Sequence, residues 1–195
     1  HGTNIQQLSE LLKKNPHLKF ASWSECQNHY LEQCSPLSRY LELQFMHLTL
    51  DELHKPYEEK SNLSLIKIPS GDRKGLQTFI NICKQAFGYE MSLSVLLNTS
   101  HSPKAELFLL VDNKDAVATA LTYSTADALG IYQVSVPPNH QGKGYARTLI
   151  GKLLKYAKTK HVKTVTLQAS EQGLNLYRQL NFKVDGKLSY YNFRG

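Results

Sequence analysis

The sequence predicts a mixed α/β fold, with a mostly antiparallel sheet flanked by helices and a small α-rich extension at its N-terminal end. Three observations predict this class. The chain has 195 residues, 41% of them hydrophobic, which suits one compact domain or one domain with a small appendage. Alternating apolar runs separated by short turns fill residues 107–136. A glycine-bearing loop, a long helix and a returning strand follow, which together form a strand, helix, strand crossover.

The first 60 residues are expected to be helical and then extended. Apolar residues at helical spacing indicate a short helix that ends at Asn15-Pro16, and a second helix from Ser24 ends at Ser35-Pro36, because a residue before proline disfavours helix. Residues 41–45 then alternate as a strand does. The polar stretch 58–62 predicts a boundary, which leaves residues 1–60 as an appendage of unknown role and 61–195 as the main domain.

The main domain is expected to begin with a strand at 63–66. Apolar residues at helical spacing predict a helix over 76–87, opened by Gly71-Asp72 and closed by Gly88, and a second helical stretch follows around 91–97. Two strands at 107–111 and 117–123 flank the turn-rich tetrapeptide 112–115 and form a hairpin. A third strand at 130–136 completes a meander. The remaining elements are a helix to about residue 160, a strand at 162–169, a helix at 171–180, and a final extended pair at 182–184 and 188–193.

The basic surplus of the chain lies in its C-terminal part. The formal net charge is +7, made up of −2 over residues 1–60 and +9 over residues 61–195. One stretch of 21 residues holds Lys143, Arg147, Lys152, Lys155, Lys158, Lys160 and Lys163. This cluster indicates either an anionic ligand or a solvated helix face. There is no arginine-rich run and no basic patch interleaved with stacking aromatics, so we expect no nucleic acid partner.

Membrane, secretory and metal-binding classes are also disfavoured. The longest apolar run, residues 107–111, is far shorter than the roughly 18 to 20 residues of a membrane helix. No basic flank followed by an apolar core opens the chain, so no signal peptide is expected and a cytoplasmic location is predicted. Three cysteines, Cys26, Cys34 and Cys83, are expected to be reduced thiols. No His-Glu-x-x-His or paired Cys-x-x-Cys motif occurs, so we expect no metal.

The segment with the clearest chemistry is the loop before the long helix. Gly142 and Gly144 let the backbone curl close to a ligand, and the first amides of a helix have no acceptor within it. With the helix dipole and the charges of Lys143 and Arg147, this turn suits a phosphate or pyrophosphate. It matches neither a Rossmann fingerprint nor a P-loop. By composition alone, glycines placed there for packing remain an equal alternative.

The loop sequence Gln141-Gly142-Lys143-Gly144-Tyr145-Ala146 resembles the Gln/Arg-x-x-Gly-x-Gly/Ala acyl-CoA signature of the GNAT superfamily of N-acetyltransferases. Residues 170–182 resemble the later family pattern Asn-x-x-Ala-x-x-x-Tyr-x-x-x-Gly-Phe. Ser170, Gly173 and Asn181 depart from it, because Asn, Ala and Gly are usual there. The order of elements over residues 63–193 is also similar to the GNAT fold. The resemblance, which covers two thirds of the chain, implies a GNAT-like fold.

The resemblance further implies acetyl-CoA, or another acyl-CoA, as co-substrate. Two strands splay apart in this family, and unpaired backbone groups at Val134 and Val136 would bind the pantetheine arm, while amides from Gly142 to Arg147 would bind the pyrophosphate. The full set of expected contacts is Val134, Val136, Gln141, Gly142, Lys143, Gly144, Tyr145, Ala146, Arg147 and Ser170.

For the chemistry, the resemblance places the hydroxyl of Tyr177 beside the sulfur, as a proton donor to the departing thiolate. A packing role on its helix is the alternative. Several family members have a glutamate base in the signature strand, but the matching position here is Gly130 and the strand contains no carboxylate. Tyr132, on the same strand face, and Asp127, acting through water, are the candidates for the acceptor side.

These features predict an N-acyltransferase that moves an acetyl group from acetyl-CoA to a primary amine by direct transfer in a ternary complex. A catalytically inactive CoA-binding or sensing module, or an interaction domain, is the alternative. The acceptor stays open among small amines, antibiotics, amino acids, peptides and proteins. Residues 1–60 could cover the acceptor side, complete a degenerate second half of the fold, or mediate self-association as a homodimer.

Overall fold

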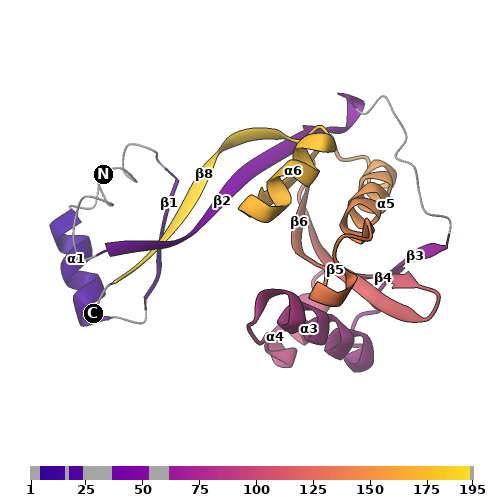
Figure 1. Ribbon diagram of the computed structural model, residues 1–195, viewed down its shortest axis with the longest axis horizontal. Helices are drawn as coiled ribbons and strands as arrows, with labels where there is room; N and C mark the ends of the chain where they lie inside the picture. The colour runs from indigo at the N-terminus through magenta and orange to yellow at the C-terminus, as the bar shows by residue number, and fades with distance from the viewer. Residues whose placement is uncertain (1–4, 16–17, 24–36, 53–61, 194–195) are drawn as a thin grey trace. The chain divides into compact units, whose positions relative to one another are not determined.

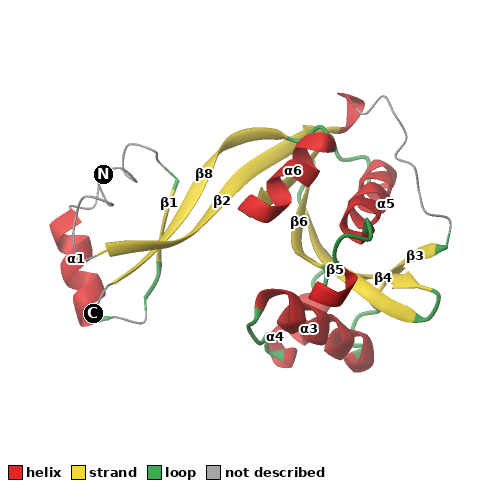
Figure 2. Cartoon of the chain, viewed as in Figure 1, coloured by secondary structure: helices red, strands yellow, loops and turns green. Residues whose placement is uncertain are grey.

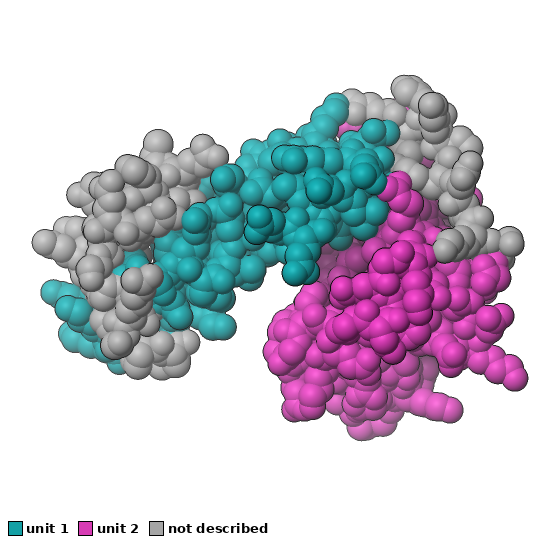
Figure 3. Space-filling view, in the orientation of Figure 1, with its two compact units in different colours: residues 1–47, 168–195 teal, residues 48–167 magenta. Residues whose placement is uncertain are grey.

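The computed structural model describes residues 5–15, 18–23, 37–52 and 62–193. The chain divides into two compact units, one of residues 1–47 and 168–195 and the other of residues 48–167 (Figure 3). We call them unit 1 and unit 2. The predicted helix over 24–35 and the predicted boundary at 58–62 fall mostly outside the described residues. The boundary therefore stays a prediction.

Unit 2 contains the five-stranded part of the sheet, in the order β7-β6-β5-β4-β3 (Figure 2). Its elements are β3 (Leu63–Lys67), α3 (Arg73–Phe87), α4 (Leu93–Ser100), β4 (Ala105–Asp112), β5 (Asp115–Ser124), β6 (Ala128–Ser135), α5 (Tyr145–Thr159) and β7 (Thr164–Ala169), with short 3-10 turns at Leu50–Glu52 and Pro138–His140. The last two residues of β7 belong to unit 1. The β6–β7 pair is parallel and the others are antiparallel, so the expected meander and single crossover are confirmed.

Helices cover both faces of this part of the sheet (Figure 1). On one face, Cys83 of α3 lies against Thr119 of β5. On the other, the ring of Tyr156 in α5 meets Phe108 of β4. Because Phe108 pairs with Ala120, the neighbour of Thr119, alternation along the strands sends the two contacts to opposite faces. A hydrophobic core cluster lies on the α3 side and consists of Ile68, Leu76, Phe79, Ile80, Ile82, Cys83, Leu96, Leu107 and Leu109.

Local sequence signals set the ends of α3. Asp72 is the N-cap, and its carboxylate accepts from the amides of Lys74 and Gly75 at 3.1 and 3.2 Å. Gly88 closes the helix with φ of 77°, and its amide donates to the Lys84 carbonyl. The predicted helix is therefore confirmed with both of its caps. The second helix, α4, begins two residues later than expected.

Unit 1 contains α1 (Ile5–Lys14), β1 (Phe20–Ser22), β2 (Leu37–Thr49), α6 (Glu171–Gln179) and β8 (Lys183–Phe193). Its strand order is β1-β8-β2, all antiparallel. The described part of the predicted extension thus holds one helix and two strands. The strand β1 was not expected, because three residues carry no periodicity of their own and its pairing with β8 defines it.

The prediction of two extended segments at 182–184 and 188–193 is wrong, because β8 is one continuous strand. Phe45 pairs with Gly186 and Met46 pairs with Val184, so Asp185 is an extra residue in a β-bulge. The Asp185 carboxylate lies 2.7 Å from Nδ1 of His47 on the neighbouring strand. The residues between the two predicted segments therefore continue the strand, with a β-bulge at Asp185.

Candidate functional site

The loop between β6 and α5 has a backbone that requires glycine. Gly142 and Gly144 have φ angles of 75° and 84°, in the left-handed region that side chains disfavour. A Cβ at Gly142 would meet no atom within 4 Å. Conformation, and not lack of room, therefore requires glycine at this position. The pattern of residues 141–146 predicts the loop correctly for this reason.

Gln141 closes the loop on itself. Its side-chain Nε2 donates to the carbonyl of Val136 at 3.1 Å, and its amide donates to the carbonyl of Pro138 at 3.3 Å. The ring of His140 lies 5.9 Å from that of Tyr145. The side chain of Gln141 thus shapes the loop, which explains why an amide-bearing residue stands there.

The start of α5 can hold an anion. Gly144 is its N-cap and gives no side-chain cap bond, and the first amides of a helix have no acceptor within it. Gln141 to Gly144 and Arg147 are exposed. The positive end of the helix dipole and two nearby cations, Lys143 and Arg147, favour negative charge here. The first turn of α5 and the loop before it are therefore the candidate phosphate site.

Tyr145 lies in the loop, and its side chain also connects the loop to the β4–β5 turn. Its hydroxyl donates to Oδ2 of Asp112 at 2.7 Å, in the turn that joins β4 to β5. This hydrogen bond raises the pKa of Tyr145. The side chain fixes the start of α5 to the β4–β5 turn, which leaves the Tyr145 backbone amide for a ligand.

The end of β6 departs from regular pairing on both sides. Toward β7, the parallel register runs from Ala128 opposite Thr164 to Ile131 opposite Leu167 and stops there. Toward β5, Leu121 pairs with Tyr132 and Thr119 with Ser135, so β6 has one extra residue in a bulge. Val134 and Val136 lie beyond the last β7 pair. Their position suits backbone groups that bind an added extended ligand.

A buried polar cluster supports this bulge. Gln133 has φ of 51°, and its carbonyl accepts from the hydroxyls of Thr119 at 3.1 Å and Ser135 at 3.2 Å. The Cys83 sulfur lies 3.4 Å from the Ser135 hydroxyl, and burial raises the pKa of this thiol. Cys83 is therefore a neutral packing group. Sequence reasoning missed the cluster, because Thr119 and Cys83 lie 14 and 52 positions from their partners Gln133 and Ser135.

The two acceptor-side candidates differ in their surroundings. Tyr132 is 42% exposed on the α3 face of the sheet, immediately after the last β6–β7 pair. Asp127 is exposed at the turn before β6, and its carbonyl accepts from the amides of Lys163 and Thr164. Within the described ranges, no hydrogen bond or ion pair joins the Asp127 and Tyr132 side chains.

Tyr177 and Ser170 belong to unit 1. Tyr177 is 7% exposed, and its ring packs edge-on against Phe182 with centroids 5.8 Å apart. Burial raises the pKa of Tyr177 to about 12, so the hydroxyl keeps its proton at neutral pH. A Cβ at Gly173 would lie 3.0 Å from Cε2 of Tyr177, which explains the glycine. Ser170 is the N-cap of α6 and makes no side-chain cap bond.

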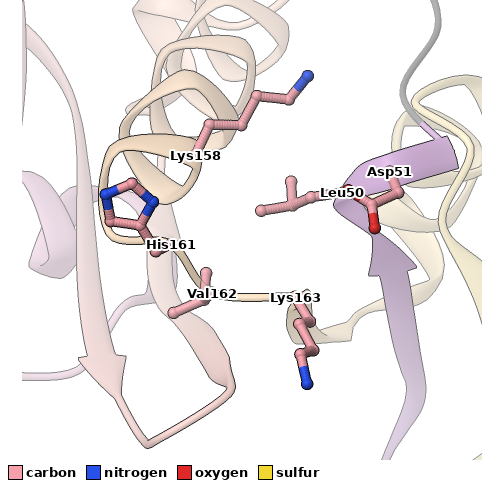
Figure 4. Close-up of a pocket in the computed structure, with 6 residues that line it drawn as sticks. All are labelled: Leu50, Asp51, Lys158, His161, Val162 and Lys163. Atoms are coloured by element: carbon pink, nitrogen blue, oxygen red, sulfur yellow. The ribbon is translucent and has the colours of Figure 1, made fainter.

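A hollow of about 450 Å³ lies at the other end of α5 (Figure 4). It is lined by Leu50, Asp51, Lys158, His161, Val162 and Lys163. A helix of 15 residues is about 22 Å long, so the hollow is far from the glycine loop. The C-terminal end of a helix is negative, and the basic residues there complement that charge. The hollow is therefore a poor anion site despite its cations.

The described residues contain neither a cluster of metal ligands nor a membrane-spanning helix. Over the described ranges, no three His, Cys, Asp or Glu side chains gather as metal ligands would. None of the helices in those ranges combines the length and hydrophobicity needed to cross a bilayer.

Comparison with protein families gives a match over residues 76–182, to the acetyltransferase (GNAT) family. Among curated proteins, the chain is similar to the ribosomal protein bS18-alanine N-acetyltransferase of Haemophilus influenzae. The two are 29% identical over 85 residues, which is 42% of this chain and 58% of that protein. The match thus spans less than two thirds of the relative.

Solved structures give the same fold. A GCN5-related N-acetyltransferase from Sphaerobacter thermophilus superimposes with a TM-score of 0.75 at 18% identity, over 96% of this chain and 65% of the other. One from Kribbella flavida gives 0.70 at 13% identity, over 98% and 74%. At such identities the likeness establishes the fold alone, and the predicted fold class is confirmed.

Proposed function

The chain belongs to the acetyltransferase (GNAT) family, and from this premise we propose that it transfers an acetyl group from acetyl-CoA to a primary amine, directly and within a ternary complex. The observation that carries the proposal is the glycine loop at the start of α5, where Gly142 and Gly144 adopt positive φ angles. We also propose that the protein works with reduced thiols in the cytoplasm, which the buried free thiol of Cys83 supports.

The residues fit acetyl-CoA by their donors and their charge. Backbone amides from Gly142 to Arg147 would hold the pyrophosphate, with Lys143 and Arg147 supplying positive charge. The backbone of Val134 and Val136 would pair with the pantetheine arm beyond the last β7 partner of β6. Gln141 would keep the loop closed, and Ser170 would contribute its uncommitted cap hydroxyl. When bound, acetyl-CoA supplies the activated acetyl thioester.

Tyr177 is the residue to which we assign the proton-donor role. Its raised pKa of about 12 keeps the hydroxyl protonated, so it can donate to sulfur as negative charge develops there. A thiol has a pKa of about 8.5, so the donated hydrogen bond stabilises the thiolate while full proton transfer from the phenol is unfavourable. We therefore propose that Tyr177 donates a strong hydrogen bond and that solvent completes the protonation.

The acceptor is a primary amine whose carrier remains to be identified. By its name, the Haemophilus relative acts on an alanine of a ribosomal protein. This supports a peptide N-terminus as one member of an acceptor panel, beside small amines, an aminoglycoside, free amino acids and a lysine peptide.

The experiment that tests the proposal measures thiol release from acetyl-CoA with each member of this panel, together with acetyl-CoA affinity by calorimetry. Transfer to at least one amine by the wild type, with loss of acetyl-CoA affinity in Gly144→Val, is the expected result. Binding of acetyl-CoA without turnover on any amine would instead favour a CoA-binding or sensing module. Absence of binding would contradict both.

A further inference from the structure

Tyr132 stands where β6 loses its neighbour. The parallel pairing with β7 stops at Ile131 opposite Leu167, and Tyr132 is the next residue along β6. On the other side it still pairs with Leu121 of β5, so its backbone is held in the sheet. The side chain is thus placed by a regular strand beside the point where the two strands separate.

The face of the sheet at this point is open to solvent. Gly130 pairs with Tyr123, and Tyr132 pairs with Leu121, so alternation puts all four residues on one face. Leu121 packs against the core under α3, which identifies this as the α3 face. Tyr123 and Tyr132 are 41% and 42% exposed. Within the described residues, the row Tyr123, Gly130 and Thr166 across three strands contains no carboxylate.

The Tyr132 ring fills the space that a side chain at position 130, where the chain has glycine, would occupy. A Cβ at Gly130 would lie 2.6 Å from Cε2 and 2.7 Å from the hydroxyl oxygen of Tyr132, closer than real Cβ contacts come. Gly130 is not among the residues with positive φ, so its backbone would accept any side chain. A side chain at position 130 is therefore compatible with the backbone but not with this position of the Tyr132 ring, which it would push aside. Gly130 and Tyr132 therefore form one unit in which the phenol replaces the missing side chain.

The hydroxyl of Tyr132 has no hydrogen-bond partner among the described residues, although it is held in a fixed place on the sheet. We propose that this hydroxyl oxygen accepts a hydrogen bond from the acceptor amine, and that Gly130 serves to make room for the phenol. The inference rests on the proposed function. It names Tyr132 as the residue that positions the amine.

A neutral hydroxyl that only accepts a hydrogen bond is too weak a base to remove a proton from an ammonium group, so the acceptor must lose its ammonium proton to water before it reacts. The neutral nitrogen then forms the C–N bond as the C–S bond breaks, the electron pair of that bond leaves on sulfur, and the second nitrogen proton passes to water. At pH 7.5 an α-amino group with a pKa near 7.8 is neutral about 260 times more often than a lysine with a pKa near 10.4. The inferred substrate class is therefore amines of low basicity, such as α-amino groups.

The test compares Tyr132→Phe, Gly130→Ala and the control Tyr123→Phe with the wild type. Kinetics are measured on a peptide α-amine and a matched lysine amine from pH 6 to 9.5. The wild-type kcat/KM should rise with the neutral fraction of each amine and favour the α-amine about 100-fold at pH 7.5. Tyr132→Phe should lower kcat/KM about 10-fold, mainly through KM, while acetyl-CoA affinity, thermal stability and Tyr123→Phe stay at wild-type values.

A double-mutant comparison separates positioning from sheet stability. If Gly130→Ala acts by displacing the phenol, it should lower kcat/KM at least 10-fold in the wild type and change it less than 2-fold in a Tyr132→Ala background. Equal losses in both backgrounds, or full activity of Tyr132→Phe in an active enzyme, would overturn the inference and leave the proposed function standing. A wild type that acetylates no amine would overturn the proposed function, and the inference with it.

Discussion

Single side chains in this protein are tuned by burial and by backbone angle. Burial raises the pKa of Tyr177 to about 12 and also raises the pKa of the Cys83 thiol, which moves both groups further from ionisation. Positive φ angles restrict Gly142 and Gly144, whereas space restricts Gly130. Glycine thus serves backbone conformation at Gly142 and Gly144 and leaves space for a side chain at Gly130, so substitutions in the two places have different consequences.

Replacing Tyr177 with phenylalanine removes one oxygen and leaves the ring against Phe182. One hydrogen-bond donor to developing negative charge contributes about 10² to 10³-fold, so we expect kcat to fall about 100-fold, or about 2.7 kcal/mol in the barrier. Single-turnover kinetics measure the chemical step directly. Thermal unfolding and acetyl-CoA affinity should stay unchanged. If the free energy of unfolding fell by as much as the barrier rose, Tyr177 would instead have a packing role.

Gly142→Ala and Gly186→Ala form a matched pair, because a Cβ meets no atom within 4 Å at either position and only Gly142 has a positive φ. A non-glycine residue in the left-handed region costs about 1–2 kcal/mol. We expect Gly142→Ala to shift the loop and weaken acetyl-CoA binding about 10-fold, measured by calorimetry, with Gly186→Ala unchanged. Equal affinity of the two variants would count against the loop as the pyrophosphate site.

Among the elements, α5 is the helix on which the site depends, and it is fastened at both ends. Near its start, Tyr145 bonds to Asp112. Near its end, the buried carboxylate of Glu106 on β4 accepts from Tyr156 at 2.6 Å and from Lys160 at 3.3 Å, and also from Lys67 of β3. The helix start that presents the loop is thereby fixed relative to β3 and β4.

The Glu106 cluster predicts a pH dependence of stability. Burial alone would raise the pKa of Glu106, but hydrogen bonds from Lys67 and Tyr156 and the charge of Lys160 outweigh it and lower the pKa. The contribution of a group with a lowered folded-state pKa is complete above its unfolded pKa of about 4.3 and is lost as pH falls through the folded value. Denaturant unfolding should show Glu106→Gln about 2 kcal/mol less stable than the wild type at pH 7. That difference should shrink below pH 4, and a difference independent of pH would contradict the ionic role.

At the scale of the whole molecule, two compact units contain different parts of the predicted machinery. The loop, the end of β6 and the Tyr132 face belong to unit 2, and Ser170 and Tyr177 belong to unit 1. Both β2 and β7 run from one unit into the other along the chain.

Acetyl-CoA should stabilise the folded protein by a free energy that rises with the logarithm of its concentration. At 100 times Kd a ligand adds about 2.7 kcal/mol, and a chain of this size gains about 2–4 °C in Tm per kcal/mol, so we expect a rise of about 5–10 °C. Differential scanning fluorimetry measures it. Gly142→Ala at the same ligand concentration should show a smaller rise, and an unchanged Tm of the wild type would argue against binding.

The sequence by itself determined the features that depend on near neighbours. The caps of α3 at Asp72 and Gly88, the hairpin turn at 112–115 and the glycines of the loop follow from local backbone preferences, and the structure has each of them. The order of elements from β3 to α6 also follows, because apolar periodicity marks the helices and strands there.

Only the tertiary structure decided which distant groups meet. Glu106 gathers partners 39, 50 and 54 positions away, and Asp185 becomes a bulge because β2 pairs alongside it. The placement of the Tyr132 phenol over Gly130 likewise needs a part of the strand face that stays exposed beyond the last β6–β7 pair. These outcomes depend on which strands pair and which surfaces remain open, and local periodicity contains no information on either.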